Sequence, residues 1–220
     1  MSIDYVVRAV ERSEVRDFIE RHHYSHNING LMSSYCFAMY DQADAMVGAM
    51  IYGKLGMANA WKKYGDSIDE VMELRRLVLI DDTPKNSESY FIGHTLRWLK
   101  TNTEVKTIVS YADPNYGHSG IIYRATNFEH VGMTAPGKVI IWNGKKYHDK
   151  AIRTKYKGEL KPFAKRLRQA LEDGEAHYEK QLPKHIYVKN LRPGKGAKPK
   201  RKRMIKNEHT RADTPSAQNR

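Results

Sequence analysis

Runs of alternating or continuous apolar residues mark the strands that we expect in this chain. They are rich in Val, Ile, Leu, Tyr and Phe, and polar stretches containing Gly, Pro, Asn or Asp separate them. The predicted strands cover residues 3–10, 32–41, 44–53, 71–80, 105–112, 130–134, 138–142, 145–148 and 184–191. Asn143-Gly144, between two of these runs, is typical of a type I′ hairpin turn that joins two strands closing the sheet.

Apolar residues at helical spacing predict helices over residues 13–23, 87–100, 117–128 and 159–173. Ser13 and Ser87 are expected as the N-caps of the first two. Strands precede and follow the helices in the second half of the chain, whereas the first half holds a meander. This order predicts an α/β fold (α+β mixed), a central mixed β-sheet with helices on both faces.

The excess of positive over negative charge lies entirely in the C-terminal part of the chain. Residues 1–135 hold 14 Lys and Arg against 17 Asp and Glu, while residues 136–220 hold 24 against 8. A block of this kind is typical of proteins that bind a polyanion, because each neutralised phosphate releases counterions. We interpret residues 1–190 as one folded domain and residues 191–220, rich in Lys, Arg, Pro and Gly, as a disordered tail.

The chain has one cysteine, Cys36, and no apolar run of the roughly 18 residues that a membrane helix needs. No signal-peptide core is found at the N-terminus. These features predict a protein without a membrane partner that works in the cytoplasm of a cell.

The predicted strand 71–80 leads into a helix that begins near Ser87. Free N–H groups at a helix start attract phosphate, and Lys85, Ser87 and Ser89 could add contacts to it. An ordinary capped helix start explains the same residues, because no Gly-rich phosphate loop is present.

The next strand leads into "SYADPNYGHSGIIYRATNF", residues 110–128. Asp113 could accept a proton from an amine or orient it, and Ser110 and Tyr123 lie within reach of the same strand end. If the two strands are parallel neighbours, both junctions meet at one edge, where ligands of open α/β sheets bind. Taken singly, Asp113 could instead cap the next helix and Tyr123 could fill the core.

Two further groups of residues could carry chemistry. "RHHYSH" places His22, His23, Tyr24 and His26 at the end of the first helix, as a metal site, an acid/base or stacking platform, or a polar helix end. In "ELRR", Glu73 shares a strand face with Arg75 and is expected to pair with it, which leaves Arg76 for a ligand.

The three motifs "RHHYSH", "ELRRLVLIDDTPKNSESYFIGHTLRWLK" and "SYADPNYGHSGIIYRATNFEHVG" together resemble the phage Mom DNA-modification proteins, which look like members of the GNAT acyltransferase superfamily. The resemblance covers about residues 20–145, and weakly "PKHIYV" near the end. The sequence departs from the superfamily where "DDTPKNSES" replaces the customary Gly-rich pyrophosphate loop.

The resemblance implies a GNAT-like fold and an acetyl-CoA-dependent modification of the exocyclic N6 amine of adenine in double-stranded DNA. The product would be a methylcarbamoyl-type adduct that protects phage DNA from host restriction, made in the host cell cytoplasm. The family's important residues map to His23, Tyr24, Arg76, Asp113 and Tyr123, with Ser110 as an addition.

The expected mechanism begins with extrusion of the target base from the duplex. Tyr24 or Tyr123 would stack on the base, Asp113 would take the amine proton with His23 as the other acid/base candidate, and Arg76 would hold CoA or a phosphate. A methylcarbamoyl group has one more nitrogen than an acetyl group, and the family is thought to use iron for the additional rearrangement. The ligands to examine are then His22, His23 and His26.

Three other functions remain open from the sequence. A metal-dependent nuclease would need several clustered carboxylates, of which only Asp113 is well placed. A DNA-binding protein without catalysis would leave the polar strand ends without a role. An acyltransferase could also act on an amine outside DNA, although the basic C-terminal block favours DNA.

Overall fold

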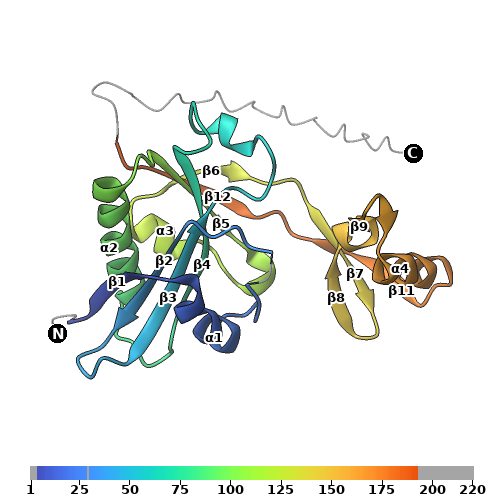
Figure 1. Cartoon of the computed structure of the whole chain (residues 1–220), viewed down its shortest axis with the longest axis horizontal. Helices are drawn as coiled ribbons and strands as arrows, with labels where there is room; N and C mark the ends of the chain where they lie inside the picture. Colours follow the sequence, from blue (N-terminus) through green and yellow to red (C-terminus); the bar gives the residue numbers. More distant parts are fainter. Residues whose placement is uncertain (1–3, 29, 193–220) are drawn as a thin grey trace, which may run out of the picture.

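The computed structural model describes residues 4–28 and 30–192, and its main body is built on one mixed β-sheet (Figure 1). The order of the strands across this sheet is β1-β2-β3-β4-β5-β12-β6. Only β4 and β5 run parallel to each other within it. The seven strands of this sheet are β1 (Val6–Val10), β2 (Tyr35–Tyr40), β3 (Met46–Gly53), β4 (Val71–Leu79), β5 (Thr107–Ala112), β6 (Glu129–Met133) and β12 (His185–Asn190).

Helices cover both faces of this sheet, which confirms the predicted fold class. Helix α1 (Arg12–His22) buries Val15 and Ile19 against Ala38 and Ala49 of the strands. Helix α2 (Ser87–Asn102) covers the other face, where its apolar stripe packs against the alternate strand residues, and α3 (Ile121–Ala125) lies beside it. Successive residues of a strand face opposite sides of the sheet. A strand that is apolar throughout therefore contributes side chains to the core under α1 and to the core under α2.

Strands β4 and β5 are paired along only part of their length. Val71–Leu74 pairs with Thr107–Ser110, and beyond Leu74 strand β4 is paired with β3 alone. At the same point the register between β3 and β4 shifts, so that Arg75 is an extra residue in β4. A β-bulge of this kind bends a strand, and here it coincides with the point where the two parallel strands separate.

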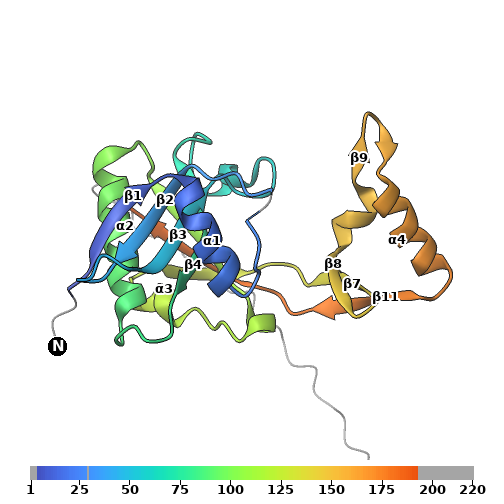
Figure 2. The same ribbon diagram turned by 60° about the horizontal axis from the view of Figure 1, so that its bottom comes forward.

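Residues 137–181 form a second, smaller unit that projects from the main body, and we refer to it as the arm (Figures 1 and 2). It has a sheet of its own in the order β11-β7-β8 and a small core that contains Ile140, Leu167 and Ala170. The elements of the arm are β7 (Gly137–Trp142), β8 (Lys145–His148), η3 (Asp149–Arg153), β9 (Lys155–Tyr156), β10 (Glu159–Leu160), α4 (Pro162–Glu172) and β11 (Ala176–Gln181).

Three local predictions need correction. The Asn143-Gly144 hairpin is present, with φ of 49° and 69°, but β7 and β8 belong to the arm and do not close the main sheet. Glu11 is the N-cap of α1 and exchanges hydrogen bonds with Glu14, so Ser13 lies inside the helix. Asn86 is the N-cap of α2.

The remaining described segments are the short helices η1 (Ala60–Lys63) and η2 (Pro114–Tyr116) and the loops. None of the helices within residues 4–28 and 30–192 has the length and apolar character needed to cross a membrane. The predicted disordered tail lies outside the described residues, apart from its first two positions. There Leu191 is buried and Arg192 donates hydrogen bonds to the carbonyl groups of Lys100 and Thr103 at the end of α2.

Candidate active site

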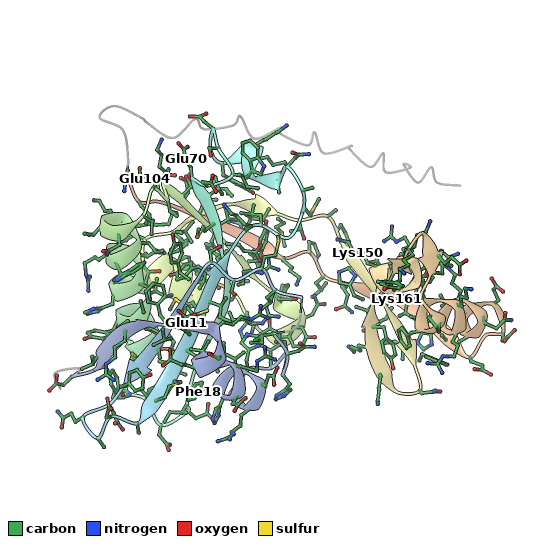
Figure 3. The ribbon with its side chains drawn as sticks, viewed as in Figure 1. Glu11, Phe18, Glu70, Glu104, Lys150 and Lys161 are labelled. Atoms are coloured by element: carbon green, nitrogen blue, oxygen red, sulfur yellow. The ribbon has the colours of Figure 1, made fainter. Side chains whose placement is uncertain are left out.

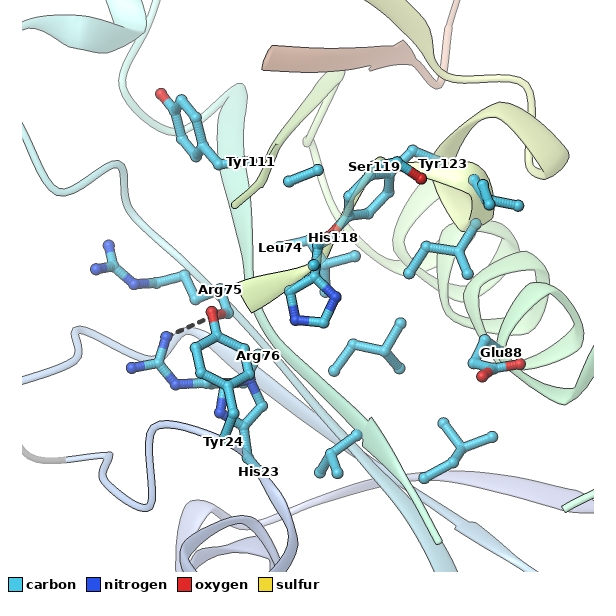
Figure 4. Close-up of a pocket in the computed structure, with 18 residues that line it drawn as sticks. His23, Tyr24, Leu74, Arg75, Arg76, Glu88, Tyr111, His118, Ser119 and Tyr123 are labelled. Carbon is cyan, nitrogen blue, oxygen red and sulfur yellow. Dashed lines mark hydrogen bonds between the residues drawn. The ribbon is translucent and has the colours of Figure 1, made fainter. Parts of the chain in front are cut away.

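A cleft of about 320 Å³ lies where β4 and β5 separate (Figure 4). One wall is β4 from Leu74 to Leu79, and the other is formed by Ala112 and the segment from Gly117 to Tyr123. His23 and Tyr24, at the end of α1, also line it, as do Glu88 and Tyr111. The two strand ends that the sequence suggested as a common site therefore do share one cavity.

Residues from both faces of the sheet line this cleft. Leu77 and Tyr123 belong to the core on the α2 side, whereas Val78 packs with the core under α1. Side chains from both faces of the sheet thus border one cavity.

Tyr123 is a buried titratable group of the cleft, with 8% of its surface exposed. Burial raises the pKa of its phenol to about 12, although a hydrogen bond with the Ser110 side chain by itself would lower that pKa. Ser110 is fully buried and donates to the carbonyl oxygen of Leu74, 3.3 Å away. Tyr123 is thus a neutral proton donor at physiological pH, and the hydrogen bond with Ser110 helps to hold its hydroxyl in place.

Asp113 follows β5 and is held by several hydrogen bonds. Asn115 donates to Oδ1 from its backbone nitrogen at 3.0 Å and from its side chain at 2.7 Å, and Lys184 Nζ lies 2.6 Å from Oδ2. Burial alone would raise the pKa of Asp113, but the hydrogen bonds and charge of Lys184 and Asn115 outweigh it and lower that pKa. The carboxylate is ionised and caps η2, as one of the two predictions for this residue had it. Asp113 is not among the residues that line the cleft, although its neighbour Ala112 is.

His23 is 5% exposed, and its Nδ1 accepts a hydrogen bond from the backbone nitrogen of Ser25 at 3.1 Å. This bond places the proton of the neutral ring on Nε2. Burial, and then the positive charge of Arg76, lower the pKa of His23 to about 4. His23 is therefore a neutral N–H donor rather than a cation at physiological pH.

Four aromatic rings meet at the mouth of the cleft. The ring of Tyr24 lies 4.2 Å from that of His23, 4.4 Å from that of Tyr116 and 5.2 Å from that of His118. Tyr24 and Tyr116 are 44% and 52% exposed, so part of each ring remains accessible to solvent. We refer to these four residues as the ring stack.

The histidines of "RHHYSH" do not converge on one point. His22 packs on Phe18 with ring centroids 4.6 Å apart, and His26 Nδ1 bonds to the carbonyl oxygen of Glu20 at 2.9 Å. No group of three or more His, Cys, Asp or Glu side chains among residues 4–28 and 30–192 could hold a metal ion. The residues that are described thus do not fit the iron site suggested for His22, His23 and His26, and they give no support to a metal-dependent nuclease.

Arg75 and Arg76 diverge as expected from the strand pattern. Arg75 forms the predicted ion pair with Glu73, at 3.4 Å, and both side chains are largely buried. Arg76 faces the cleft and donates through Nη1 to the Arg75 carbonyl at 2.7 Å (Figure 4). Its Nη2 donates to the carbonyl oxygen of Asn27 at 3.4 Å, and its Nε is buried without a hydrogen-bond partner among the described residues.

The start of α2 contributes a different residue from those expected. Ser87 is fully buried and donates its hydroxyl to the carbonyl oxygen of Pro84 at 2.7 Å, which leaves it no contact with the cleft. Lys85 and Ser89 are not among the residues that line the cleft, whereas Glu88 is. The structure therefore does not bring the three expected cofactor contacts to this cavity.

The sequence did not single out Tyr187, although this residue shapes the site. Tyr187 of β12 is buried, accepts a hydrogen bond from Arg124 at 2.9 Å and donates one to the Ser119 carbonyl at 3.0 Å. Gly120 has a φ of +76°, and a Cβ at this position would lie 2.3 Å from the Tyr187 ring. A larger residue would therefore displace the wall that carries Tyr123.

Comparison with known proteins identifies the family to which these features belong. The family model of the Mom protein family matches residues 4–209. The chain belongs to the Mom family. The resemblance stated from the three motifs is thus confirmed. A curated member, the methylcarbamoylase mom of Escherichia phage Mu, is 31% identical over 120 residues. This match covers 53% of the present chain and 49% of the phage Mu protein, so the chain matches about half the length of that relative.

Solved acetyltransferases are similar to this Mom-family chain in structure. An N-acetyltransferase from Staphylococcus aureus Mu50 has a TM-score of 0.49 at 12% identity, covering 86% of this chain and 100% of its own. The ribosomal-protein-S5-alanine acetyltransferase from Vibrio fischeri has a TM-score of 0.48 at 10% identity, with 87% and 96% covered. A GNAT family N-acetyltransferase from Escherichia coli in complex with CoA has a TM-score of 0.44 at 11% identity, with 59% and 71% covered.

Proposed function

We propose that this protein is a phage DNA-modification enzyme that transfers an acyl group from acetyl-CoA to the exocyclic N6 amine of adenine in double-stranded DNA. The observation that carries the proposal is the cleft between the diverging strands β4 and β5, in a chain of the Mom family, with Tyr123, His23 and Arg76 on its walls. Modified adenine would protect the DNA from host restriction endonucleases.

The shape of the cleft suits an extended acyl carrier. Beyond Leu74, strand β4 has a strand partner only on its β3 side, so its other edge offers backbone N–H and C=O groups to the cleft. An extended chain that contains amide groups, such as the pantetheine arm of CoA, can bond to such an edge. The guanidinium of Arg76, which lines the cleft, would hold a phosphate or a carbonyl oxygen.

The reaction forms one bond and breaks another. The adenine N6 attacks the thioester carbonyl carbon, a C–N bond forms, the C–S bond breaks, and N6 loses one proton while the departing sulfur gains one. Tyr123 donates the proton to sulfur, since its raised pKa keeps it protonated. Asp113, kept ionised by Lys184, takes the amine proton, and the Nε2–H of His23 stabilises the developing charge on the carbonyl oxygen.

This step gives an acetylated amine, and a methylcarbamoyl product requires one further nitrogen. The described residues do not fit a metal ion at the histidine cluster, so no step is assigned to iron. The mass of the modified nucleoside distinguishes the two products.

The ring stack suits a base taken out of the duplex. Base flipping requires an aromatic surface that replaces the lost stacking, worth about 1–3 kcal/mol per base. The exposed rings of Tyr24 and Tyr116 provide that surface at the entrance of the cleft, beside His23.

Purified full-length protein, acetyl-CoA labelled in the acetyl group and unmodified duplex DNA test the proposal together. We expect label in the DNA and release of free CoA, both strongly reduced for the Tyr123→Phe variant. A small-molecule or peptide amine in place of DNA tests the alternative acceptor. Label in those amines and none in DNA would show that the acceptor is not DNA.

A further inference from the structure

The arm carries an excess of positive charge. Residues 137–181 contain 12 Lys and Arg and 6 Asp and Glu. Only Lys146 and Arg153 of these cations form ion pairs within the described residues, with Glu179 and Asp149. The other ten are without a counter-charge there, a balance that favours binding of an anionic partner.

Helix α4 arranges part of this charge in a stripe. Lys161, Lys165 and Arg168 occur at intervals of four and three residues and are exposed, while Ala164, Leu167 and Ala170 face the core of the arm. The stripe extends over about 10 Å. Like charges at this spacing weaken a helix, and cations in its first turn oppose the helix dipole. Arg168 contributes to the fold of the arm, because its Nε donates to the Ile152 carbonyl oxygen at 2.8 Å, whereas repulsion along the stripe works against folding. An anionic partner would offset this repulsion.

The hairpin β9–β10 adds a second basic projection. Tyr156, 67% exposed, lies between Lys155 and Lys157. Lys157 occupies the turn with a φ of +47°, a conformation in which Asn or Gly is usual. Figure 3 labels Lys150 and Lys161, two further cations of the same unit.

The base of the arm is fastened to the candidate active site. Its outgoing and returning segments are joined to each other, because the backbone nitrogen of Thr134 donates to the Lys184 carbonyl at 2.9 Å. The returning segment is joined to the site, where Leu182 donates to the Asn115 side chain at 2.9 Å and Lys184 pairs with Asp113. A partner bound to the arm is therefore placed in a defined relation to the cleft.

We propose that the arm is a duplex-DNA binding element, which grips phosphates through the α4 stripe and the basic hairpin while the target base enters the cleft. Rigid cations on a helix hold phosphates by charge, whereas single strands are commonly held by stacked aromatic rings, which the stripe lacks. The inference rests on the proposed function, since it takes DNA as the partner of the site.

Duplex binding of the full chain, measured by fluorescence anisotropy over a series of salt concentrations, tests the arm without requiring catalysis. For Lys161→Ala/Lys165→Ala we expect roughly tenfold weaker binding and a salt slope reduced by about 1.8, since each lost phosphate contact removes about 0.9. The charge-conserving variant Lys161→Arg/Lys165→Arg should retain the wild-type affinity and the wild-type salt slope. The matched control Arg97→Ala/Lys100→Ala removes two exposed cations from α2, on the far side of the main body from the arm (Figure 1), and should leave the slope nearly unchanged.

Thermal unfolding of the same variants excludes a structural explanation. Loss of repulsion within α4 should leave the melting temperature of Lys161→Ala/Lys165→Ala unchanged or slightly higher. Equal affinity and slope for this variant and the wild type would overturn the inference, as would equal losses in the α2 control. Acyl transfer to DNA by the wild type would in that case still support the proposed function, so the two proposals fail separately.

Discussion

Lys184, at the point where the chain returns from the arm, forms an ion pair with Asp113, at the end of β5, with 2.6 Å between Nζ and Oδ2. The carboxylate is 5% exposed, whereas the lysine side chain remains about half exposed. One contact thus links the arm, the strand end and the group proposed to take a proton from the amine. It also means that the charge of Asp113 depends on a residue far away in the sequence.

Lys184→Met should destabilise the protein by about 1–2 kcal/mol at neutral pH, because Asp113 loses its counter-charge while it stays buried. The folded-state pKa of Asp113 is lowered by this pair, so the stabilisation is present above the unfolded pKa and is lost as pH falls through the folded value. Urea unfolding at pH 7 and at pH 3 should show a difference from wild type that shrinks at the lower pH. A difference of equal size at both would show that the lysine acts through packing alone.

Gly120→Ala should disturb the cleft, because the new methyl group would lie 2.3 Å from the ring of Tyr187. We expect a loss of about 2–3 kcal/mol of stability together with loss of acyl transfer. Gly117→Ala is the matched control, with the same φ of +76° but no atom within 4 Å of a Cβ. It should lose only about 1 kcal/mol, from backbone strain. Similar melting temperatures for the two variants would contradict the close approach at Gly120.

Tyr123→Phe should lower kcat by about 10²–10³, since the leaving sulfur loses its proton donor while the ring still fills its place. KM for acetyl-CoA should change little. The pKa of about 12 also predicts that wild-type activity does not decline between pH 8 and 10 through ionisation of Tyr123. Release of free thiol measures both quantities. A Tyr123→Phe enzyme with wild-type kcat would remove Tyr123 from the reaction.

His23 should make the fold sensitive to mild acid. Its pKa is about 4 in the folded protein, against 6.5 for an ordinary histidine, so the unfolded chain takes up a proton first as pH falls. The stability of the wild type should decline between pH 6.5 and 4, and His23→Gln should show a smaller decline. Melting temperatures at intervals across this range measure the effect, and parallel curves for the two proteins would contradict it.

The sequence predicts the main sheet well because its apolar runs are long and rich in β-branched residues. Strands β4 and β5 and the buried stripe of α2 are recognisable for that reason, and so is the parallel pair that creates the site. The alternation of strand faces correctly predicted the pairing of Glu73 with Arg75 and the exposure of Arg76 to the cleft. It did not predict the bulge at Arg75, which also lines the cleft.

The arm could not be predicted in the same way. The alternation in β7 shows that one face is buried, but it does not show which sheet buries it. Strand β11, with the sequence AHYEKQ, is too polar to be recognised, and it is a strand only because β7 pairs with it. The ion pair of Lys184 with Asp113 could not be predicted either, because no local sequence pattern connects a lysine with a carboxylate more than seventy positions earlier.

The ring stack shows the same limit at the site. The sequence suggests that Tyr24 could stack on a base, but Tyr116 and His118 come from the other end of the site and join it only through the fold. At the start of α2, in contrast, the sequence suggested ligand contacts that the structure does not place in the cleft. Serines at a helix start resemble phosphate contacts, yet Ser87 uses its hydroxyl to close its own turn on Pro84.

Mass spectrometry of nucleosides from the DNA of cells that express this protein tests the central claim most directly, with Tyr123→Phe as the control. We expect a deoxyadenosine derivative whose added mass identifies an acetyl or a methylcarbamoyl group, present with the wild type and absent or much reduced with the variant. Deoxyadenosine of unchanged mass, from cells that contain soluble wild-type protein, would contradict the proposed modification of adenine.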